Sequence, residues 1–589
     1  MASSRTAWRL GGLRWEVARP WPAAAETARR LKTSPLITQI LHNRGLEDLG
    51  EIRRFLSPKL TDLHPPELLP DIDLAAERIC RAVRDGEKTC IYGDYDVDGV
   101  AGVAILFRCL AMHGAAVDYY VPHRLAEGYG VNVEAVRSIA QSGAQLLVTV
   151  DCGISACEPL RQAAALGMDV IVTDHHAPPE RLPEAVAVVH PGLPGRPYPN
   201  PGLPGAGVAF KLAWQVARRL SGSDRVDEPT RNFLLEATSL AALGIIADVV
   251  PLLGENRVLA VYGLKGLAAS EHVGIRALLK SAGLAGARLD SYDVGFVLAP
   301  RLNACGRMGH ARLAVELLAR ADAARCRRIA EHLERQNTRR QRIEREIFEQ
   351  AVDMLEQGRA AAPTDFAIVL ASPDWHGGVI GIVASRLVTR FGRPAVLIAV
   401  DGEDGHGSAR SIDGFHMHDA LAACAEHLTS FGGHAMAGGL RLPASRIEAF
   451  AKAFAGFAAE HVTAEMLAPA LRLDAEATLS ELSLPVVEHL ERLGPFGQAN
   501  PRPLLAVRSC RLLAPPQRMG RGGETVSFVV GQERPASPAK RMRCVGFGMG
   551  ELADALVGIN TVDIAGEPVL DRFNARLSVQ MHLRDVVRV

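Results

Sequence analysis

Short apolar runs alternate with amphipathic helical segments through residues 89–189, and this alternation constrains the fold more than any other feature of the chain. Helical segments are predicted at Val100–Met112, Val133–Gln141 and Ala156–Leu166. The apolar runs around them are Thr89–Tyr92, Val117–Val121, Leu146–Val150, Val170–Thr173 and Val186–Val189. Strands that alternate with helices of this length indicate βαβ units, so the sequence predicts an α/β fold built on a parallel sheet.

The rest of the 589-residue chain predicts further modules. One hydrophobic core seldom grows beyond about 300 residues, so three or four domains are expected. A helix is predicted at Asp227–Leu243. The charged stretch Ala321–Gly358 has no interior Gly or Pro and predicts a connector helix of about 50 Å. A second α/β unit follows, with a strand at Ala367–Leu370, a helix at Val379–Phe391 and a strand at Ala395–Val400.

The segment after residue 470 changes to short β-like runs separated by Gly and Pro turns, which predicts a small β-barrel. The runs are Val507–Leu513, Thr525–Val530, Arg543–Phe547 and Leu577–Leu583. We therefore expect an N-terminal helical segment (1–65), a parallel-sheet domain (66–270), a helical connector (271–358), a second α/β domain (359–465) and a C-terminal barrel (466–589). Pro191–Pro204 is expected to be an ordered loop.

Composition excludes several classes of protein. No run of about 18 uncharged apolar residues occurs, so we expect no transmembrane helix, and the first residues lack the apolar stretch of a secretory signal. The ten cysteines form no CxxC pair, which is typical of reduced cytoplasmic thiols. With 66 basic and 66 acidic residues, the chain does not coat nucleic acid by bulk charge, although this balance is compatible with a local basic groove.

Acidic and histidine side chains directly follow the predicted strands. In an open parallel sheet, ligands bind beyond the carboxyl ends of the strands, so these side chains are expected along one rim. Asp248 follows another apolar stretch, Leu243–Ala247, and would close the cluster. The others are Asp94, Asp96 and Asp98 after the first run, Asp151 after the third, and Asp174, His175 and His176 after the fourth.

So many carboxylates on one rim require positive charge, because like charges a few ångströms apart resist joint ionisation. Oxygen ligands with one or two imidazoles suit Mn²⁺ or Mg²⁺ better than they suit a thiolate-type zinc site. Two such ions about 3.5–4 Å apart activate a water and stabilise the leaving oxygen of a phosphodiester. A single Asp after a strand is most often a helix cap or a turn residue, but the whole set is hard to explain in that way.

The motifs around these residues resemble the DHH phosphoesterases, and the form of the first motif resembles the RecJ branch of that superfamily. The motifs are Gly93-Asp94-Tyr95-Asp96-Val97-Asp98-Gly99, Val150-Asp151-Cys152-Gly153, Asp174-His175-His176 and Ala247-Asp248-Val249-Val250-Pro251. The resemblance implies that Asp94, Asp96, Asp151, His175 and Asp248 ligate two Mn²⁺ or Mg²⁺ ions. It implies that Asp98 and His176 support these ligands or face the scissile phosphate.

Other stretches resemble substrate-binding motifs of the same branch. They are Pro122–Arg124 with Glu127–Gly130, Asn303–Arg307, and the glycine-rich Trp375–Val379, Gly407–Ser411 and Gly432–Gly439, expected as loops of a DHHA1 domain. By resemblance, Arg124 and Arg307 lie near the DNA backbone or its 5′ phosphate, and Ser408 and Arg410 grip that phosphate. The residues implied to line the same cleft are Asn303, His376, Gly433 and His434.

Leu493–Pro501 resembles the start of a RecJ OB-type domain, a fold that binds single strands in a groove. The stretch has few aromatic residues, and each is expected in the core: Phe496, Phe528, Phe547 and Phe573. Basic backbone contacts are expected instead from Arg518, Arg521, Arg541 and Arg543. His190 stands where the family often has Asn, which leaves the contact made by that loop open.

The resemblance implies a metal-dependent 5′→3′ exonuclease specific for single-stranded DNA, which releases 5′-mononucleotides in DNA repair and recombination. It also implies a single-strand-binding protein and a helicase as partners, and a monomer is expected. One alternative is a DHH phosphodiesterase acting on short oligonucleotides or cyclic dinucleotides, but the extra barrel and N-terminal segment favour a long polymer. Another is a non-catalytic replication scaffold, which the intact acidic set opposes. The preferred metal and the choice between RNA and DNA stay open.

Overall fold

The computed structural model describes residues 12–123, 127–128, 130–223, 225–358, 360, 365–468, 470–534, 537–572 and 577–589. The chain divides into two compact units. One unit is Lys59–Leu467, and the other combines Met1–Pro58 with Ala468–Val589.

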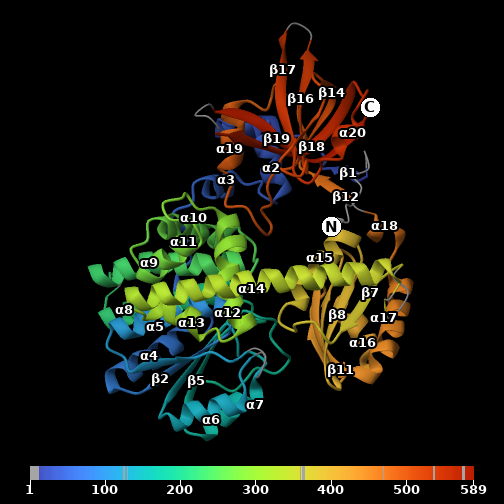
Figure 1. Ribbon diagram of the computed structural model, residues 1–589. Coiled ribbons are helices and arrows are strands. Elements are labelled where there is room, and N and C mark those ends of the chain that lie inside the picture. Colours follow the sequence, from blue (N-terminus) through green and yellow to red (C-terminus); the bar gives the residue numbers. More distant parts are fainter. Residues whose placement is uncertain are drawn as a thin grey trace. The chain divides into compact units, whose positions relative to one another are not determined.

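Five parallel strands of the larger unit form the predicted sheet, in the order β3-β2-β4-β5-β6. Figure 1 labels β2 and β5 of this sheet. Their bounds are β2 (Thr89–Gly93), β3 (Val117–Tyr120), β4 (Leu146–Val150), β5 (Asp169–Thr173) and β6 (Ala187–Val189). Every residue of β2 and β4 is buried, as expected for central strands covered on both faces. This confirms the predicted α/β class.

Helices cover the two faces of this sheet. One face packs on α4 (Ile72–Asp85), α5 (Val97–Met112) and α8 (Gly205–Ser221). The other face packs on α6 (Val133–Gln141) and α7 (Cys157–Ala165). Further helices enlarge the first core: α9 (Glu228–Ala247), α10 (Gly254–Ala268), α11 (Val273–Ser281), the π-helical turn η3 (Asp293–Leu298), α12 (Ala299–Met308) and α13 (Arg312–Ala319). Pro191–Pro204 is described throughout and forms neither helix nor strand.

The charged stretch forms one helix of 34 residues, α14 (Ala323–Glu356), as predicted. The side chain of Asp322 caps its start by accepting from Arg325 N at 2.8 Å. Ile329 and Leu333 in its first half belong to the core of the parallel-sheet module. Ile347 and Val352 in its second half pack in the core of the next module. The helix therefore connects the two α/β modules, as Figure 1 shows in yellow-green.

The second module has a five-stranded mixed sheet in the order β10-β11-β9-β8-β7. Its elements are β7 (Ile368–Ser372), α15 (Ile380–Phe391), β8 (Ala395–Asp401), β9 (Asp404–Arg410), α16 (Met417–Ala423), β10 (Ser430–Gly433), β11 (Ala437–Pro443), α17 (Ile447–His461) and α18 (Ala464–Leu467). The stretches 407–411 and 432–439, expected as loops, largely form strands. This strand position requires glycine, because a Cβ on Gly407 would lie 2.7 Å from the Leu440 side chain.

The smaller unit contains the predicted barrel. Strands β14, β18, β19, β17 and β16 pair in that order, and Arg511↔Gly531 and Leu512↔Val530 join β16 back to β14, so the sheet closes. Its elements are β12 (Ala470–Leu473), β13 (Ala475–Glu476), α19 (Leu484–Glu491), β14 (Leu505–Leu512), β15 (Gln517–Met519), β16 (Thr525–Arg534), β17 (Ser537–Gly546), α20 (Leu552–Ala555), β18 (Thr561–Asp571) and β19 (Ser578–Arg588). The sequence pattern missed β18, which contains Gly566 and Pro568 in its middle.

The N-terminal residues belong to this barrel unit rather than forming a separate helical segment. They form β1 (Arg14–Val17), α1 (Ala24–Leu31), α2 (Pro35–Asn43) and α3 (Leu49–Leu56). β1 pairs in parallel with β12, and Trp15 Nε1 donates to Asp585 Oδ2 at 2.7 Å. A strand whose partner lies more than 450 residues away leaves no local signal, which is why only helices were predicted here. Short 3₁₀ turns stand at Leu60–Asp62, Pro66–Leu68, Ala425–His427 and Ala444–Arg446.

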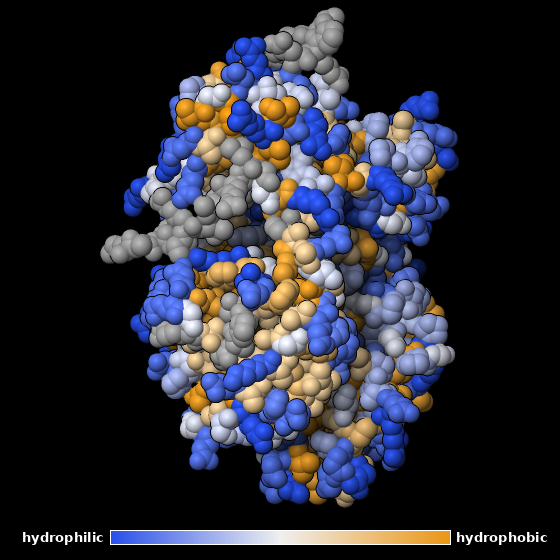
Figure 2. Space-filling model, turned by 90° about the vertical axis from the view of Figure 1, so that its right-hand side faces the viewer, coloured by the Kyte–Doolittle hydropathy of each residue, from blue (hydrophilic) through white to orange (hydrophobic). Residues whose placement is uncertain are grey.

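The surface in Figure 2 has hydrophilic side chains around a paler, weakly hydrophobic area. Within the part of the chain that the structure describes, no helix has both the length and the apolar character needed to cross a bilayer.

Candidate metal and substrate site

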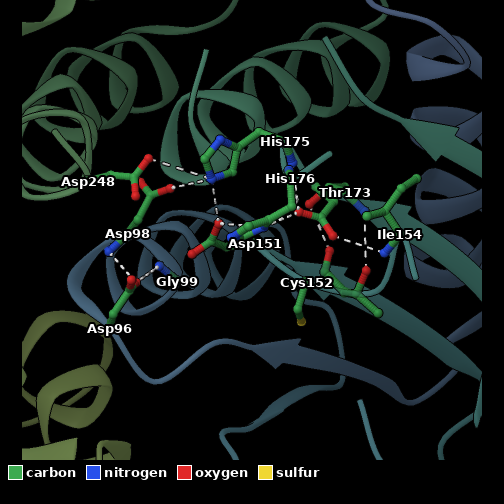
Figure 3. A network of polar contacts seen from close by, with 12 residues as sticks. Asp96, Asp98, Gly99, Asp151, Cys152, Ile154, Thr173, His175, His176 and Asp248 are labelled. Carbon is green, nitrogen blue, oxygen red and sulfur yellow. Dashed lines mark hydrogen bonds and ion pairs between the residues drawn. The ribbon is translucent and has the colours of Figure 1, made fainter. Parts of the chain in front are cut away.

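The structure gathers all seven predicted catalytic side chains at one edge of the parallel sheet. Figure 3 labels all of them except Asp94. Asp94 follows β2, Asp151 follows β4, and the histidines follow β5, while Asp248 caps the C-terminus of α9. Candidate ligand atoms lie within 4.8 Å of one another in three overlapping groups: Asp94, Asp96 and Asp151; Asp98, His175 and Asp248; and Asp151, His175 and His176.

His175 lies at the centre of the cluster. Its Nε2 is 3.1 Å from Asp151 Oδ1, 3.6 Å from Asp248 Oδ2 and 3.8 Å from Asp98 Oδ2. Burial lowers the pKa of His175 to about 4, so the imidazole is neutral near pH 7. Histidine binds metal ions as a neutral imidazole, and this imidazole faces several carboxylates.

Among the described residues, the buried atoms of this cluster without a hydrogen-bond partner include Asp98 Oδ2, Asp151 Oδ1 and His175 Nε2. Burial, and then the neighbouring carboxylates, raise the pKa of Asp98 and of Asp151 well above the ordinary value. The same causes raise the pKa of Asp248 to about 7. A bound divalent cation would satisfy these atoms and remove the repulsion, so the residues present fit Mn²⁺ or Mg²⁺.

The first acidic motif is held by the start of α5. Asp96 is the N-cap residue, and its Oδ1 accepts from Asp98 N at 2.9 Å and from Gly99 N at 3.1 Å. A Cβ on Gly99 would lie 2.7 Å from the Asp94 carbonyl oxygen, so only glycine lets the helix begin so close to the strand end. The spacing of the three aspartates thus follows from the strand-to-helix turn.

Asp151 has a left-handed backbone conformation, with φ of 60°. Non-glycine residues rarely adopt it, and where they do, the strain is often found at functional sites. The conformation places the Asp151 carboxylate beside His175 while Asp151 N still donates to Thr173 O at 3.0 Å.

Asp174 supports the histidine pair, a role that the sequence analysis did not assign. Its Oδ1 accepts from His175 N (2.7 Å), His176 N (3.1 Å) and His176 Nδ1 (2.7 Å), and its Oδ2 accepts from Ile154 N (2.9 Å). Burial alone would lower the pKa of His176, but the hydrogen bond and charge of Asp174 outweigh it and raise that pKa to about 9. The available signal was its position, directly after β5.

The structure shows the contacts of His190, which stands where the family often has Asn. The side chain is 1% exposed; its Nε2 donates to His176 O at 2.7 Å, and its Nδ1 accepts from Gly192 N at 3.0 Å. Burial lowers the pKa of His190, so the ring stays neutral and serves both contacts. His190 therefore holds the turn that carries the histidine pair.

The N-terminus of α8 also points at the cluster. Asp98 Oδ1 accepts from Ala206 N at 3.0 Å. A Cβ on Gly205 would lie only 2.5 Å from the Asp151 Cβ. The partial positive charge of a helix N-terminus stabilises nearby carboxylates. The sequence pattern did not reveal this element, whose N-cap residue is Pro204.

Helix α12 links the acidic loop to the second α/β module. A Cβ on Gly306 would lie 3.1 Å from Tyr95 O, and Arg307 Nη1 donates to Gly378 O at 3.0 Å. His376 Nδ1 accepts from Gly378 N at 3.1 Å, which places His376 in the same turn. Asn303 lies one helical turn before Arg307.

Ser408 and Arg410 lie on β9, beside the start of α15. Arg410 Nη1 donates to Ser408 Oγ at 3.0 Å and to Ala409 O at 2.8 Å. A Cβ on Gly381, in the first turn of α15, would lie 2.7 Å from Ser408 Oγ. A guanidinium, a hydroxyl and a helix N-terminus together suit a phosphate.

The glycine turn after β10 lies beside the same strands. Gly433 has φ of 143°, and a Cβ there would meet Ala437 O at 2.3 Å, so the position requires glycine. His434 is exposed, and its N–H donates to Ala437 O at 2.8 Å. Ala437 pairs with Arg410 in the register of β11 and β9. Arg124 lies outside the described residues.

The aromatic side chains of the barrel unit differ in their exposure to solvent. Phe528 is buried, as expected, and Phe496 is half-buried beneath Arg502. The expectation for Phe547 was wrong: its ring is 64% exposed, and it packs edge-on against His582. Phe573 lies outside the described residues. Among the arginines, Arg521 and Arg541 are exposed, Arg518 pairs with Asp554, and Arg543 Nε donates to Ser527 Oγ at 3.2 Å.

Three family models match the chain: the DHH family N-terminal domain over residues 88–245, the DHHA1 domain over residues 364–460 and the RecJ OB domain over residues 473–585. The single-stranded-DNA-specific exonuclease RecJ of Bacillus subtilis is 36% identical over 576 residues, covering 97% of this chain and 70% of that protein. The chain belongs to the RecJ family. The RecJ protein of Dickeya dadantii is also 36% identical, over 95% of this chain and 96% of its own length.

Solved RecJ structures agree with this assignment. The crystal structure of RecJ in complex with Mn²⁺ from Thermus thermophilus has a TM-score of 0.82 and 32% identity, covering 98% of this chain and 80% of that chain. A structure of exonuclease RecJ bound to manganese has a TM-score of 0.57 and 39% identity, covering 66% of this chain and 95% of that chain. The predicted resemblance to RecJ and the predicted fold class are therefore confirmed.

Proposed function

We propose that this chain hydrolyses single-stranded DNA from the 5′ end and releases 5′-mononucleotides, using two bound Mn²⁺ or Mg²⁺ ions. The observation that carries the proposal is the set of buried carboxylate and imidazole atoms without hydrogen-bond partners, among the described residues, at the strand ends. Relatives named single-stranded-DNA-specific exonucleases support the substrate, and RecJ crystals with Mn²⁺ and Mg²⁺ support the metal.

In this proposal, Asp94, Asp96, Asp151, His175 and Asp248 hold the ions. Two divalent ions would supply an activated water and stabilise charge on the leaving oxygen. Asp98 lies within the same group as His175 and Asp248, so it supports or joins the ligand set. Asp174 fixes the His176 ring through Nδ1, which directs the other ring nitrogen to the phosphate.

Polarity comes from anchoring the end of the strand. Ser408, Arg410 and the start of α15 bind the 5′ phosphate, and Arg307 binds the adjacent backbone. An anchored end fixes which phosphodiester reaches the acidic cluster, so one nucleotide is removed in each turnover. We assign the remaining lining to Arg124, Asn303, His376, Gly433 and His434.

Two other functions fit the structure less well. A phosphodiesterase for dinucleotides or cyclic dinucleotides has no use for a closed OB-type barrel, and this chain has one. A non-catalytic replication scaffold has no need of metal ligands, and all seven candidate side chains are present and gathered. Both observations favour the exonuclease.

Further parts of the proposal concern the cellular setting. We place the enzyme in DNA repair and recombination in the bacterial cytoplasm, as a monomer, with a single-strand-binding protein and a helicase as partners. Support comes from the bacterial relatives. The proposed domains keep the boundaries at residues 66–270, 271–358, 359–465 and 466–589, with residues 1–65 as the N-terminal segment, most of which (up to Pro58) packs with the barrel.

A nuclease assay with Mn²⁺ tests this function. The substrates are a single strand labelled at the 5′ or the 3′ end, and the same sequence as a duplex. We expect the 5′ label to appear at once as mononucleotide, from the single strand alone. Asp151→Ala should abolish cleavage, whereas Asp85→Ala, the same change on the exposed end of α4, should not. No cleavage by the wild type, or cleavage of very short strands only, would contradict the proposal.

A further inference from the structure

Two exposed aromatic side chains stack on each other in the turn before α12. Tyr292 is 59% exposed and Phe296 is 70% exposed. Their ring centroids are 4.8 Å apart, and the ring planes meet at 23°. Among the described residues, Phe547 is the other strongly exposed aromatic, but its ring packs against His582. Neither ring of the Tyr292–Phe296 pair serves the core, so its exposed faces are available to a ligand.

The backbone beneath the pair is firmly held. Asp290 Oδ1 accepts from Tyr292 N at 2.8 Å and from Asp293 N at 3.1 Å, which caps the turn. Val294 and Leu298 are buried in the core of the parallel-sheet module. The turn is π-helical, and such turns occur most often at functional sites. A rigid backbone lowers the entropic cost of using these rings for binding.

The turn that carries the pair packs against α9, whose C-terminus holds Asp248, and it leads into the helix that carries the substrate residues. A Cβ on Gly295 would lie 3.9 Å from the side chain of Ile246, two residues before Asp248 in α9. η3 continues into α12, and Phe296, Asn303 and Arg307 follow at spacings of seven and four residues. Asn303 and Arg307, four residues apart in α12, lie on one side of that helix, and the same continuous helical segment carries the aromatic pair.

We propose that Tyr292 and Phe296 form a platform on which nucleobases of the single strand stack, on the 3′ side of the cleaved bond. The inference rests on the proposed function, in which the 5′ end is anchored beyond Arg307 at Ser408 and Arg410. Stacking uses the flat face that every base has, so the platform holds the strand without reading its sequence. Asp290 precedes the pair and Asp293 lies between its two residues in the sequence; both carboxylates repel phosphates, so bases rather than backbone face the rings here.

The test compares two 5′-phosphorylated substrates, an oligothymidylate of about twenty nucleotides and a dinucleotide. The double variant Tyr292→Ala/Phe296→Ala should raise KM and Kd for the long strand about 5- to 100-fold, which is the range for losing one stacked base. Cleavage of the dinucleotide, which does not reach the platform, should keep its kcat/KM. Phe296→Trp should match the wild type, whereas Phe296→Leu should behave like Phe296→Ala, because leucine is apolar but has no flat ring.

Leu74→Ala is the matched control, since Leu74 is 57% exposed on α4. A long strand with an internal abasic stretch completes a double-mutant cycle. The wild type should bind the abasic strand more weakly than the intact strand. The double variant should bind the two strands equally. Equal binding of the intact long strand by the wild type and the double variant would overturn the platform and leave the proposed function standing. If the wild type neither binds nor cuts single strands, the proposed function fails, and the platform with it.

Discussion

Individual residues around the acidic cluster matter as much for support as for metal binding. Asp174 and His190 each hold the histidine turn through a hydrogen bond, and the start of α8 contacts Asp98 and Asp151. Outer contacts of this kind orient ligands and tune their affinity for metal. Their replacement should therefore reduce function without removing a ligand.

Asp174→Asn tests this support. The amide keeps the size of the side chain but loses the charge and cannot accept every hydrogen bond that Asp174 accepts. We expect the Mn²⁺ concentration for half-maximal activity to rise about 10- to 100-fold. A metal titration of the nuclease activity measures it, with Asp85→Asn as the surface control. An unchanged Mn²⁺ requirement would show that Asp174 does not position the pair.

Gly205→Ala tests the approach of α8. The new methyl group would lie 2.5 Å from the Asp151 Cβ, so the helix or the aspartate must move. We expect a destabilisation of about 1–3 kcal/mol and a loss of most activity. Gly456→Ala is the control: Gly456 lies within α17 with nothing within 4 Å of its Cβ position, so alanine should stabilise that helix slightly. Normal stability and activity of Gly205→Ala would refute the close approach.

At the scale of helices and strands, the predictions succeeded where the signal was local. The strands of the parallel sheet and the helix α14 were found within a few residues, because continuous apolar runs and a Gly-free charged stretch identify them. β1 was missed because its partner is distant in sequence, and β18 because Gly566 and Pro568 in its middle resemble a turn. The strands that carry Ser408 and Gly433 were taken for loops, since glycine usually marks turns.

The convergence of the acidic residues was also predictable, because parallel strands end at a common rim. The contribution of α8 was not, because it depends on how a helix more than fifty residues beyond Asp151 packs against the sheet. The expectation that Phe547 is buried failed for a related reason: exposure depends on which face of the barrel a strand end presents.

Helix α11 gives a prediction at this scale. Its N-cap, His272, accepts from Gly274 N at 3.1 Å and Ile275 N at 3.3 Å through Nδ1, which requires an unprotonated ring. Burial and the charge of Arg108 lower the pKa of His272 to about 4, against an ordinary value of 6.5. The unfolded chain therefore binds a proton at a higher pH than the folded one. The stability from this cap is complete above pH 6.5 and falls as the pH decreases from 6.5 towards 4.

Asparagine caps helices without titrating in this range. We therefore expect His272→Asn to lose less thermal stability than the wild type between neutral pH and about pH 5. Melting temperatures of both proteins across this interval provide the measurement, with His461→Asn, at the exposed end of α17, as the control. Parallel curves for wild type and His272→Asn would contradict the assignment.

For the whole molecule, the division into two units predicts that metal binding stabilises only one of them against unfolding. All candidate ligands lie in Lys59–Leu467. Binding to the folded state stabilises it by about 2.7 kcal/mol at a hundredfold excess over Kd. In calorimetry, Mn²⁺ should raise the unfolding temperature of this unit and leave the barrel unit unchanged. Asp151→Ala should remove the shift, and an equal shift of both units would contradict the prediction.

The pairing of β1 with β12 also bears on how the chain is made. The ribosome releases residues 14–17 long before it produces Ala470–Leu473 and Asp585, with which they pack. At roughly 5–20 residues per second, the delay is on the order of half a minute to two minutes. During that interval Lys59–Leu467 emerges as a continuous stretch and folds first. Residues 14–17 have no partner strand until then, so the barrel unit is the last part of a newly made molecule to reach its native state.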